Sequence, residues 1–242
     1  MPDVIAIIPA RMGSTRFPGK ALAADTGTPL ILHVAEAVAA AGTVSRVLVA
    51  SADPEIAVAC ERGGVEHALT APGHPNGSSR IAEVSAGLQA DIILNVQGDE
   101  PEIEAATMDA TVRALVEDQQ ADVATAAAPL QPHEDPDDPN LVKVVTGRDG
   151  RALYFSRSDV PADRAASGVE RLRHIGIYAY RPAVLAAYAN LDPTPLETAE
   201  QLEQLRLLEH GYRIAVARVS AAHPGIDTPE QYAAFVARVG RG

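Results

Sequence analysis

The chain has 242 residues, and its 20 Lys and Arg against 32 Asp and Glu give a formal charge of −12. Hydrophobic residues make up 47% and charged residues 21% of the sequence, a composition that excludes a disordered chain. The acidic balance argues against duplex nucleic acid as the main partner, because binding a phosphate backbone requires a basic surface. A small phosphorylated ligand needs only a few well-placed cations, so the charge does not exclude one.

Cysteine content and hydropathy narrow the class of protein further. The single cysteine, Cys60, excludes a disulfide framework and a metal site built on several thiolates. The N-terminus has no basic segment before its apolar run, so no secretory signal is predicted. No apolar run approaches the roughly 18 residues that a membrane span requires. We therefore expect a single globular domain over residues 1–242, located in the cytoplasm, with no membrane or nucleic-acid partner.

Short apolar runs rich in β-branched residues alternate with helical patterns through the first part of the chain. Such runs are typical of buried strands in a parallel sheet. Thr28 is expected to cap the first helix with Pro29 in its first turn, and Asp53 to cap the second. The alternation predicts a doubly wound α/β sheet. The predicted strands are 4–8, 46–50, 65–69 and 92–96, and the predicted helices about 30–41, 54–63 and 78–88.

The regular alternation of strands and helices ends at about residue 120, and a predicted hairpin then precedes further strands and helices. Residues 131–140 predict an exposed loop rather than a domain boundary. A leucine stripe over 196–209 predicts one helix that ends at Gly211, and its apolar face is expected to lie in the core. The other predicted elements are hairpin strands 142–145 and 152–155, strands 175–180 and 214–219, and helices 182–190 and 229–239, the last capped by Asp227 or Thr228.

Two loops at the carboxyl ends of predicted strands could carry chemistry, because ligands of open α/β sheets bind at these ends. Residues 9–20 supply three cations, two glycines and two hydroxyls, which suits a polyphosphate. The segment is not a Walker loop, since Ala21 stands where a magnesium-binding hydroxyl is required, and it lacks a dinucleotide fingerprint. A flexible basic loop is the alternative. Residues 97–101 place Asp99 after a buried strand, where it could be a magnesium ligand or an ordinary turn residue.

These segments together resemble a known family. Residues 4–11 with 14–20 resemble the opening of the sugar cytidylyltransferases, and residues 95–101 narrow the resemblance to the 3-deoxy-manno-octulosonate (KDO) cytidylyltransferases. Further matching blocks follow in the same order, so nearly the whole chain is covered. These blocks are 140–145, 152–157, 173–178, 202–206 and 225–230.

The resemblance implies a nucleotide-diphospho-sugar transferase-like α/β fold with a mixed sheet and a small β-rich dimerisation region at about 131–180. It implies Mg²⁺ as cofactor, bound by Asp99 and Asp227, and a homodimer as the assembly. The implied catalytic residues are Arg11, Lys20, Asp99 and Asp227. The implied nucleotide-binding residues are Ala10, Arg11, Ser14, Lys20, Ser78 and Arg80. The implied sugar-binding residues are Gln97, Arg157, His174, Tyr178, Glu203 and Gln204.

The implied reaction joins CTP and a 3-deoxy-2-ketoaldonic sugar acid, KDO or a close relative, into a CMP-sugar with release of pyrophosphate. Positioning and charge neutralisation do most of the work in such phosphoryl transfers. Without the resemblance, His174 on an apolar strand is more typical of a core histidine, and Glu203 of a solvated helix face. Ser79 and Ala162 depart from the family pattern near the implied acceptor region, so a sialic-type or 8-amino acceptor stays an alternative. The other alternative is an inactive regulator that binds a nucleotide without turning it over.

Overall fold

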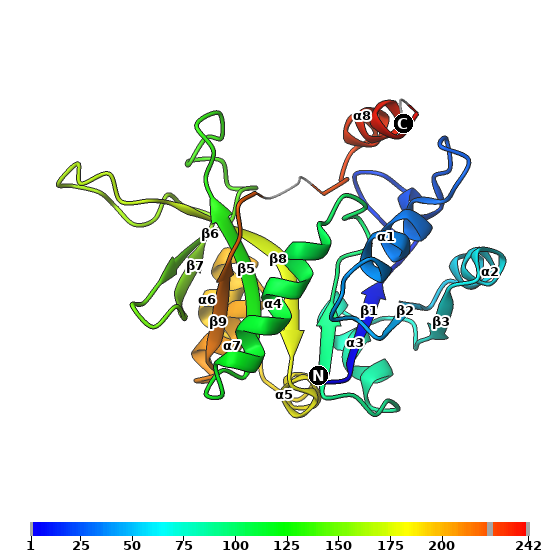
Figure 1. Cartoon of the computed structure of the whole chain (residues 1–242), viewed down its shortest axis with the longest axis horizontal. Coiled ribbons are helices and arrows are strands. Elements are labelled where there is room, and N and C mark those ends of the chain that lie inside the picture. The colour runs from blue at the N-terminus through cyan, green and yellow to red at the C-terminus, as the bar shows by residue number, and fades with distance from the viewer. Residues whose placement is uncertain (1, 222–224, 241–242) are drawn as a thin grey trace. The chain divides into compact units, whose positions relative to one another are not determined.

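The computed structural model describes residues 2–221 and 225–240. They divide into two compact units, each composed of strands and flanking helices (Figure 1). The first unit contains the described residues of Met1–Asp109 and His223–Gly242, and the second those of Ala110–Ala222. The boundary falls within helix α4 (Ala105–Glu117).

The first unit is built on four parallel strands, as the sequence predicts. The strands lie in the order β3-β2-β1-β4, and Ile7 and Ile8 of the central β1 are fully buried. Burial on both faces explains why the strand is a continuous apolar run rather than an alternating one. The four strands are β1 (Val4–Pro9), β2 (Arg46–Ser51), β3 (Glu66–Leu69) and β4 (Ile92–Asn95).

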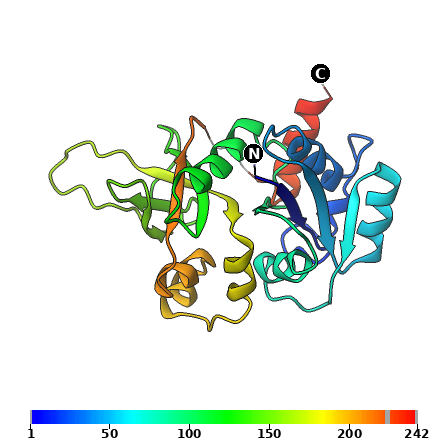
Figure 2. The same ribbon diagram turned by 60° about the horizontal axis from the view of Figure 1, so that its bottom comes forward.

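The strand order reverses direction at β1, since the chain passes from β1 to β2 and β3 and then returns to β4 on the other side. Right-handed crossovers therefore place α1 and α2 on one face of these strands and α3 on the other (Figure 2). The reversal point lies between the ends of β1 and β4, where ligands of such sheets bind. The helices of this unit are α1 (Leu30–Ala39), α2 (Pro54–Gly63), α3 (Gly77–Ser85) and α8 (Pro229–Val239).

Two helix starts differ from the prediction. Helix α1 begins at Leu30 with Pro29 as its N-cap residue, so Thr28 is not the cap. Thr28 instead takes part in a local turn, in which its N–H donates to Thr26 Oγ1. Asp53 is the N-cap residue of α2 as predicted, but its carboxylate does not cap the helix; it accepts a hydrogen bond from the N–H of Met12.

The C-terminal helix α8 belongs to the first unit although it follows the whole of the second in sequence. Thr228 is its N-cap and forms a capping box with Gln231. Ile226, Tyr232 and Phe235 form a buried cluster with Leu30 of α1. This cluster fixes the segment that carries Asp227 against the first unit.

The second unit contains a mixed sheet. Strand β5 pairs antiparallel with β8 and parallel with β9, and β6 pairs antiparallel with β7 and with the start of β8. The predicted hairpin is thus present. The strands are β5 (Val123–Pro129), β6 (Lys143–Thr146), β7 (Ala152–Ser156), β8 (Leu172–Tyr180) and β9 (Ile214–Arg218), and the helices after β8 are α5 (Pro182–Tyr188), α6 (Pro195–Glu200) and α7 (Gln204–Glu209).

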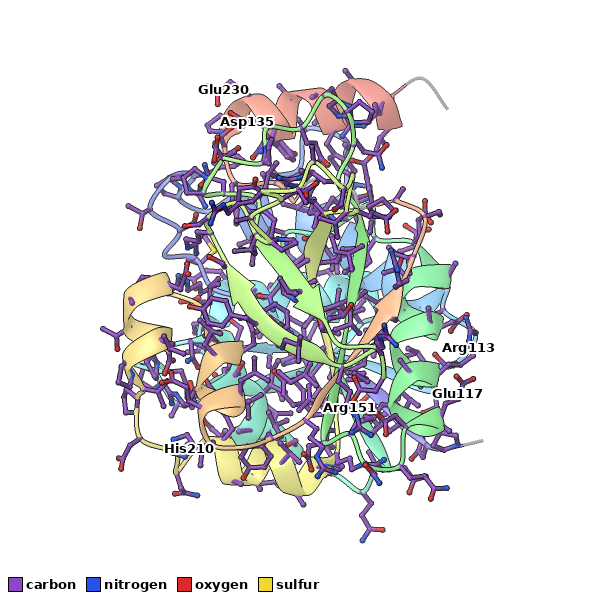
Figure 3. All side chains as sticks on the ribbon, turned by 90° about the vertical axis from the view of Figure 1, so that its left-hand side faces the viewer. Arg113, Glu117, Asp135, Arg151, His210 and Glu230 are labelled. Atoms are coloured by element: carbon purple, nitrogen blue, oxygen red, sulfur yellow. The ribbon has the colours of Figure 1, made fainter. Side chains whose placement is uncertain are left out.

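Several helices and strands of the second unit differ from the predicted elements. Helix α4 and strand β5 lie where no element is predicted; Arg113 and Glu117 project from the exposed side of α4 (Figure 3). The single helix predicted over 196–209 is two helices, because Gln201 between them adopts a left-handed conformation with φ 53°. Leu196 is accordingly 39% exposed rather than part of the core.

The single cysteine lies inside the first unit. Cys60 is fully buried in α2, and burial raises the pKa of its thiol to about 11. The thiol is therefore protonated at neutral pH and behaves as a small apolar side chain. None of the helices in the described part of the chain has the length and apolar character needed to cross a membrane.

Candidate active site

The loop after β1 is folded on itself rather than extended. The carbonyl of Met12 accepts hydrogen bonds from the N–H groups of Ser14 and Gly19, both at 3.0 Å. The N–H of Met12 donates to Asp53 Oδ2 at 2.7 Å, which ties the loop to the start of α2. Gly19 has φ 74°, a left-handed conformation that favours glycine. The loop therefore leads to Lys20 along a defined path.

Lys20 lies at the centre of a cluster of oxygen atoms from three segments far apart in sequence. Its Nζ donates to Asp99 Oδ2 at 2.7 Å, to the carbonyl of Ile226 at 2.8 Å and to Asp227 Oδ1 at 3.2 Å. The Lys20 side chain is 13% exposed, whereas those of Asp99 and Asp227 are 29% and 40% exposed. The carboxylates predicted to bind a metal thus lie together and keep an open side.

The backbone at Asp99 approaches two neighbouring segments closely. A Cβ atom at Gly98 would lie 2.8 Å from the carbonyl oxygen of Pro9, so only glycine lets the end of β4 reach the end of β1. The N–H of Ile226 donates to the carbonyl of Asp99 at 2.8 Å. These two contacts hold Asp99 next to the end of β1 and next to the segment that carries Asp227.

One arginine pairs with this cluster, and two other arginines of the first unit lie near each other. Arg16 Nη2 lies 2.7 Å from Asp227 Oδ2, an ion pair to which the sequence analysis gave no role. Arg80 of α3 is buried and donates to the hydroxyl of Thr70, a residue with no sequence signal. Burial and the nearby positive charge of Arg11 lower the pKa of Arg80, and Asp53 opposes them. Arg11 itself is exposed and close enough to Arg80 to repel it. An anionic ligand would relieve this repulsion.

The start of α3 packs against the end of β1. Asn76 caps the helix by accepting a hydrogen bond from the N–H of Ser79 at 2.9 Å. A Cβ atom at Gly77 would lie 3.2 Å from the Pro9 ring and 3.8 Å from Gln97 Oε1. Ser78, next in sequence, is 4% exposed. The predicted nucleotide-binding residues of α3 therefore adjoin the loops that follow β1 and β4.

The donor set suits a hard divalent cation. The atoms around Lys20 Nζ are two carboxylate oxygens and a backbone carbonyl oxygen, which already bind one positive charge. No group of three or more His, Cys, Asp or Glu side chains with metal-ligand geometry occurs in residues 2–221 and 225–240. Magnesium sites typically use one or two protein carboxylates and take their other ligands from water and substrate phosphates. The residues present fit such an ion.

The predicted sugar-binding residues other than Gln97 lie in the second unit. His174 and Tyr178 are neighbours on β8, with ring centroids 5.5 Å apart, and Phe155 packs edge-on against His174. Burial lowers the pKa of His174 to about 3, so the ring is neutral at neutral pH. Burial raises the pKa of Tyr178 well above its ordinary value, and the nearby Tyr180 and Glu203 raise it further. The Tyr178 phenol therefore stays protonated.

Glu203 and Gln204 begin helix α7. Glu203 is the N-cap residue and lies close enough to Tyr178 to raise its pKa. Gln204 is 5% exposed, and its Nε2 has no hydrogen-bond partner in the part of the chain that the structure describes. An orphaned buried donor is costly, so this atom is a natural contact for a ligand oxygen.

The guanidinium of Arg157, an implied sugar-binding residue, contacts three backbone carbonyl groups. Its Nε, Nη1 and Nη2 atoms donate to the carbonyls of Glu200, Pro139 and Gln201 at 2.7, 2.7 and 3.2 Å. In this structure the guanidinium therefore joins two loops. Binding a sugar carboxylate in bidentate fashion would require it to release some of these carbonyls.

Two neighbours of Arg157, Lys143 and Glu200, are not among the predicted site residues. Lys143 is fully buried, and its Nζ donates to the Arg157 carbonyl at 2.6 Å and to the Asp138 carbonyl at 3.1 Å. Burial lowers the pKa of this amine. Burial alone would raise the pKa of Glu200, but hydrogen bonds from Arg157 N–H and the Ser156 hydroxyl outweigh it and lower the pKa. These groups fix the backbone around Arg157.

All predicted nucleotide- and metal-binding residues lie within the first unit, and the structure brings Lys20, Asp99 and Asp227 together there. Gln97 also lies there, where its Nε2 donates to Asn95 Oδ1 at 3.1 Å. Arg157, His174, Tyr178, Glu203 and Gln204 lie in the second unit. Within that unit, the structure places His174, Tyr178 and Glu203 in one neighbourhood.

Comparison with known proteins agrees with this geometry. The sequence profile of a family described as cytidylyltransferase matches residues 5–214. The 3-deoxy-manno-octulosonate cytidylyltransferase of Geobacter metallireducens is 46% identical over 98% of both chains, and that of Chromohalobacter salexigens is 47% identical over 94% of this chain and 93% of the other.

A solved structure extends the comparison to the fold. A CMP:2-keto-3-deoxy-manno-octonic acid synthetase solved in complex with CTP superimposes with a TM-score of 0.94 and 38% identity over 99% of both chains. A cytidylyltransferase from Leptospira borgpetersenii, 17% identical with a TM-score of 0.65, shares the fold. Identity, coverage and fold agree, and the chain belongs to the 3-deoxy-manno-octulosonate cytidylyltransferase family.

Proposed function

We propose that the protein transfers the cytidylyl group of CTP to the anomeric hydroxyl of KDO. The hydroxyl oxygen bonds to the α-phosphorus of CTP, the bond between the α- and β-phosphates breaks, and CMP-KDO and pyrophosphate form. The observation that carries the proposal is the convergence of Lys20, Asp99 and Asp227 at the ends of β1 and β4. The product would serve lipopolysaccharide biosynthesis.

The first unit supplies the residues for the nucleotide. Arg11 and Lys20 would neutralise the β- and γ-phosphates and so stabilise the pyrophosphate that leaves. Arg80 is aligned by Thr70 and would add charge next to Arg11. The backbone of Ala10 and the Ser14 hydroxyl would complete the phosphate contacts, and Ser78 at the start of α3 would contact the cytosine.

Asp99 and Asp227 would hold Mg²⁺. Mg²⁺ bound there would polarise the α-phosphate and lower the pKa of the attacking hydroxyl. Two carboxylates placed this close repel each other unless a cation lies between them, and Lys20 supplies that cation in the structure described here. When CTP is bound, Lys20 would turn from the carboxylates to the triphosphate.

The second unit supplies residues for the sugar acid. Tyr178 keeps its phenol proton and Gln204 has an orphaned Nε2 donor, so both can donate to substrate oxygens. Glu203 would accept a hydrogen bond from a sugar hydroxyl. Arg157 is the candidate for the substrate carboxylate, and it would exchange backbone carbonyls for that anion.

The proposal includes a cytoplasmic homodimer. Leu153 on β7 is 64% exposed and Val169 in the loop before β8 is 42% exposed, both within the region 131–180. Large apolar side chains exposed in this way are typical of association surfaces. Sedimentation of the purified chain measures the mass of the assembly in solution. A monomer at micromolar concentration would contradict the proposed dimer.

Pyrophosphate release tests the function directly. The purified chain with Mg²⁺ is given CTP and a panel of octulosonic and nonulosonic acids, and then KDO with UTP, ATP or GTP in place of CTP. We expect the highest kcat/KM with CTP and KDO. Turnover only with a nonulosonic acid would contradict the acceptor, equal use of ATP would contradict the nucleotide, and CTP binding without turnover would indicate a regulator.

A further inference from the structure

Strands β5 and β8 separate locally at a bulge beside His174. Thr125 of β5 pairs with Tyr178, but the next residue, Ala126, pairs with Ile175, so two residues of β8 have no partner in β5. Thr125 is fully buried, and its hydroxyl enters the bulge. The hydroxyl lies 2.7 Å from the carbonyl oxygen of Ile177 and 3.2 Å from that of Ile175.

The same hydroxyl lies 2.9 Å from His174 Nε2. Because the hydroxyl has a single proton, its other contacts determine whether Thr125 or His174 is the donor in this hydrogen bond. A hydroxyl has one proton to donate and lone pairs with which to accept. Carbonyl oxygens can only accept, so an approach of 2.7 Å requires that the Thr125 proton point to Ile177. Thr125 Oγ1 must then accept from His174, and Nε2 must carry the ring proton.

The other ring nitrogen is consequently an acceptor. Burial lowers the pKa of His174 to about 3, so the ring has only one nitrogen-bound proton at neutral pH. With that proton on Nε2, Nδ1 presents a lone pair. Nδ1 has no hydrogen-bond partner within residues 2–221 and 225–240. Phe155 and Tyr178 contact the ring at centroid distances of 4.9 and 5.5 Å and limit its rotation.

We infer that Thr125 is a positioning residue that holds His174 as its Nε2–H tautomer, so that Nδ1 accepts a hydrogen bond from a hydroxyl of the sugar acid. The inference rests on the proposed function, because it takes His174 to be part of the acceptor site. The inference adds which partner donates in that contact. A neutral acceptor nitrogen accepts from a hydroxyl and cannot pair with the substrate carboxylate. A sugar acid that lacks the hydroxyl would leave a polar atom unpaired.

Long-range ¹H–¹⁵N spectra of histidine-labelled protein measure the tautomer without any substrate. The His174 signals are identified as those missing from His174→Asn. We expect the wild type to show a protonated Nε2 and an unprotonated Nδ1 in this residue. A protonated Nδ1 in the wild type would overturn the inference with no variant needed.

Two substitutions at Thr125 separate the hydroxyl from the shape of the side chain. Thr125→Val keeps the branched shape and loses the hydroxyl, whereas Thr125→Ser keeps the hydroxyl. We expect Thr125→Val to lose the uniform Nε2–H tautomer and to raise the KM for KDO about tenfold, the effect of one hydrogen bond. The KM for CTP should stay within about twofold, and Thr125→Ser should restore both the tautomer and the KM for KDO.

Thr111→Val is the matched control, because Thr111 is another fully buried threonine of the second unit. It should leave the His174 spectrum and both KM values unchanged, and melting temperatures of all variants report any general loss of stability. An unchanged tautomer in Thr125→Val would overturn the role of Thr125. A changed tautomer with an unchanged KM for KDO would overturn the contact of Nδ1 with the sugar. Failure of the wild type to use KDO would instead contradict the proposed function, and the spectra would still decide whether Thr125 sets the tautomer.

Discussion

Lys20 donates a hydrogen bond from Nζ to Asp99 Oδ2 at 2.7 Å, and the same ammonium group contacts Asp227. One ammonium group thus binds both of the carboxylates that would hold the metal. Metal binding to the ligand-free protein must therefore compete with a tethered cation. The CTP triphosphate offers Lys20 an alternative anion and so removes the competitor.

Removing this cation should strengthen metal binding in the absence of CTP. In Lys20→Met, we expect the Kd for Mg²⁺ to fall by about tenfold, because the two carboxylates keep their charge and lose the ammonium group that they share, although Arg16 still pairs with Asp227. Titration calorimetry of the nucleotide-free protein measures the Kd. Lys20→Arg keeps the charge and serves as the control. Weaker Mg²⁺ binding by Lys20→Met would mean that Lys20 does not compete with the metal.

Neutralising either carboxylate should reduce turnover far more than it reduces nucleotide binding. For Asp99→Asn and Asp227→Asn we expect kcat to fall by about 10²–10³, the usual effect of losing one electrostatic contact to a transition state. CTP affinity measured without metal should change little. Asp91→Asn is the matched control, since Asp91 accepts a hydrogen bond from the N–H of Asp3 away from the cluster. Nearly normal turnover of Asp99→Asn at ordinary Mg²⁺ concentrations would exclude this residue as a ligand.

A methyl group at Gly98 should separate the ends of β1 and β4. Its Cβ would lie 2.8 Å from the Pro9 carbonyl oxygen, so we expect Gly98→Ala to lose about 1–3 kcal/mol of unfolding free energy. The kcat should fall as well, because Asp99 follows directly. Gly87→Ala, whose Cβ would have its nearest contact at 3.8 Å, should be neutral or stabilising. Urea unfolding and pyrophosphate release measure the two effects, and equal behaviour of the two variants would refute the steric argument.

Replacing Arg157 with lysine should weaken acceptor binding selectively. One ammonium cannot replace three guanidinium contacts to Pro139, Glu200 and Gln201, so the two loops should loosen. We expect the KM for KDO to rise about tenfold or more and the KM for CTP to change little. Arg151→Lys removes a comparable pairing, with Asp118, and should leave the KM for KDO unaltered. A larger effect on the KM for CTP would assign Arg157 to the nucleotide.

His174 should make the protein less stable in mild acid. Burial lowers its pKa from 6.5 to about 3, so between these values the unfolded chain binds a proton that the folded chain does not. The unfolding free energy must then decrease as the pH falls below about 6.5. Relative to His174→Asn, we expect the wild type to lose about 2 kcal/mol more between pH 7.5 and pH 5.

Urea unfolding of both proteins at the two pH values gives this difference. His210→Asn is the control, because His210 is exposed and lies at the outer surface of the second unit (Figure 3). It should follow the pH dependence of the wild type. Identical pH dependence of the wild type and His174→Asn would show that the buried imidazole does not contribute.

The sequence predicts the first unit well because its signals are local. Continuous apolar strands such as β1, and the glycine and proline residues that interrupt them, identify parallel strands and their connecting loops. The convergence of Asp99 with Asp227 follows from the family motifs and the strand ends. The cation between them was not predictable, since only the folded chain shows that Lys20 turns towards the carboxylates and not towards solvent.

The second unit shows where local signals fail. Strand β5 reads Val-Ala-Thr-Ala-Ala-Ala-Pro, and its alanines have no β propensity and no alternation, so tertiary pairing with β8 and β9 alone makes it a strand. The break between α6 and α7 occurs at Gln201, a residue type that rarely adopts a positive φ. The contacts of Arg157 with backbone carbonyls also depend on folding, because no sequence pattern marks a carbonyl as an acceptor.

The burial of Cys60 has a practical consequence. It is the only cysteine of the chain, it is fully buried, and with a thiol pKa of about 11 it has almost no thiolate at neutral pH. The wild-type protein should therefore react very slowly with maleimides. A cysteine introduced at an exposed position outside the proposed dimer region, such as Val58→Cys in α2, would then be the only site that accepts a fluorophore or spin label. The natural chain can serve as a background for single-site labelling without prior removal of its own thiol.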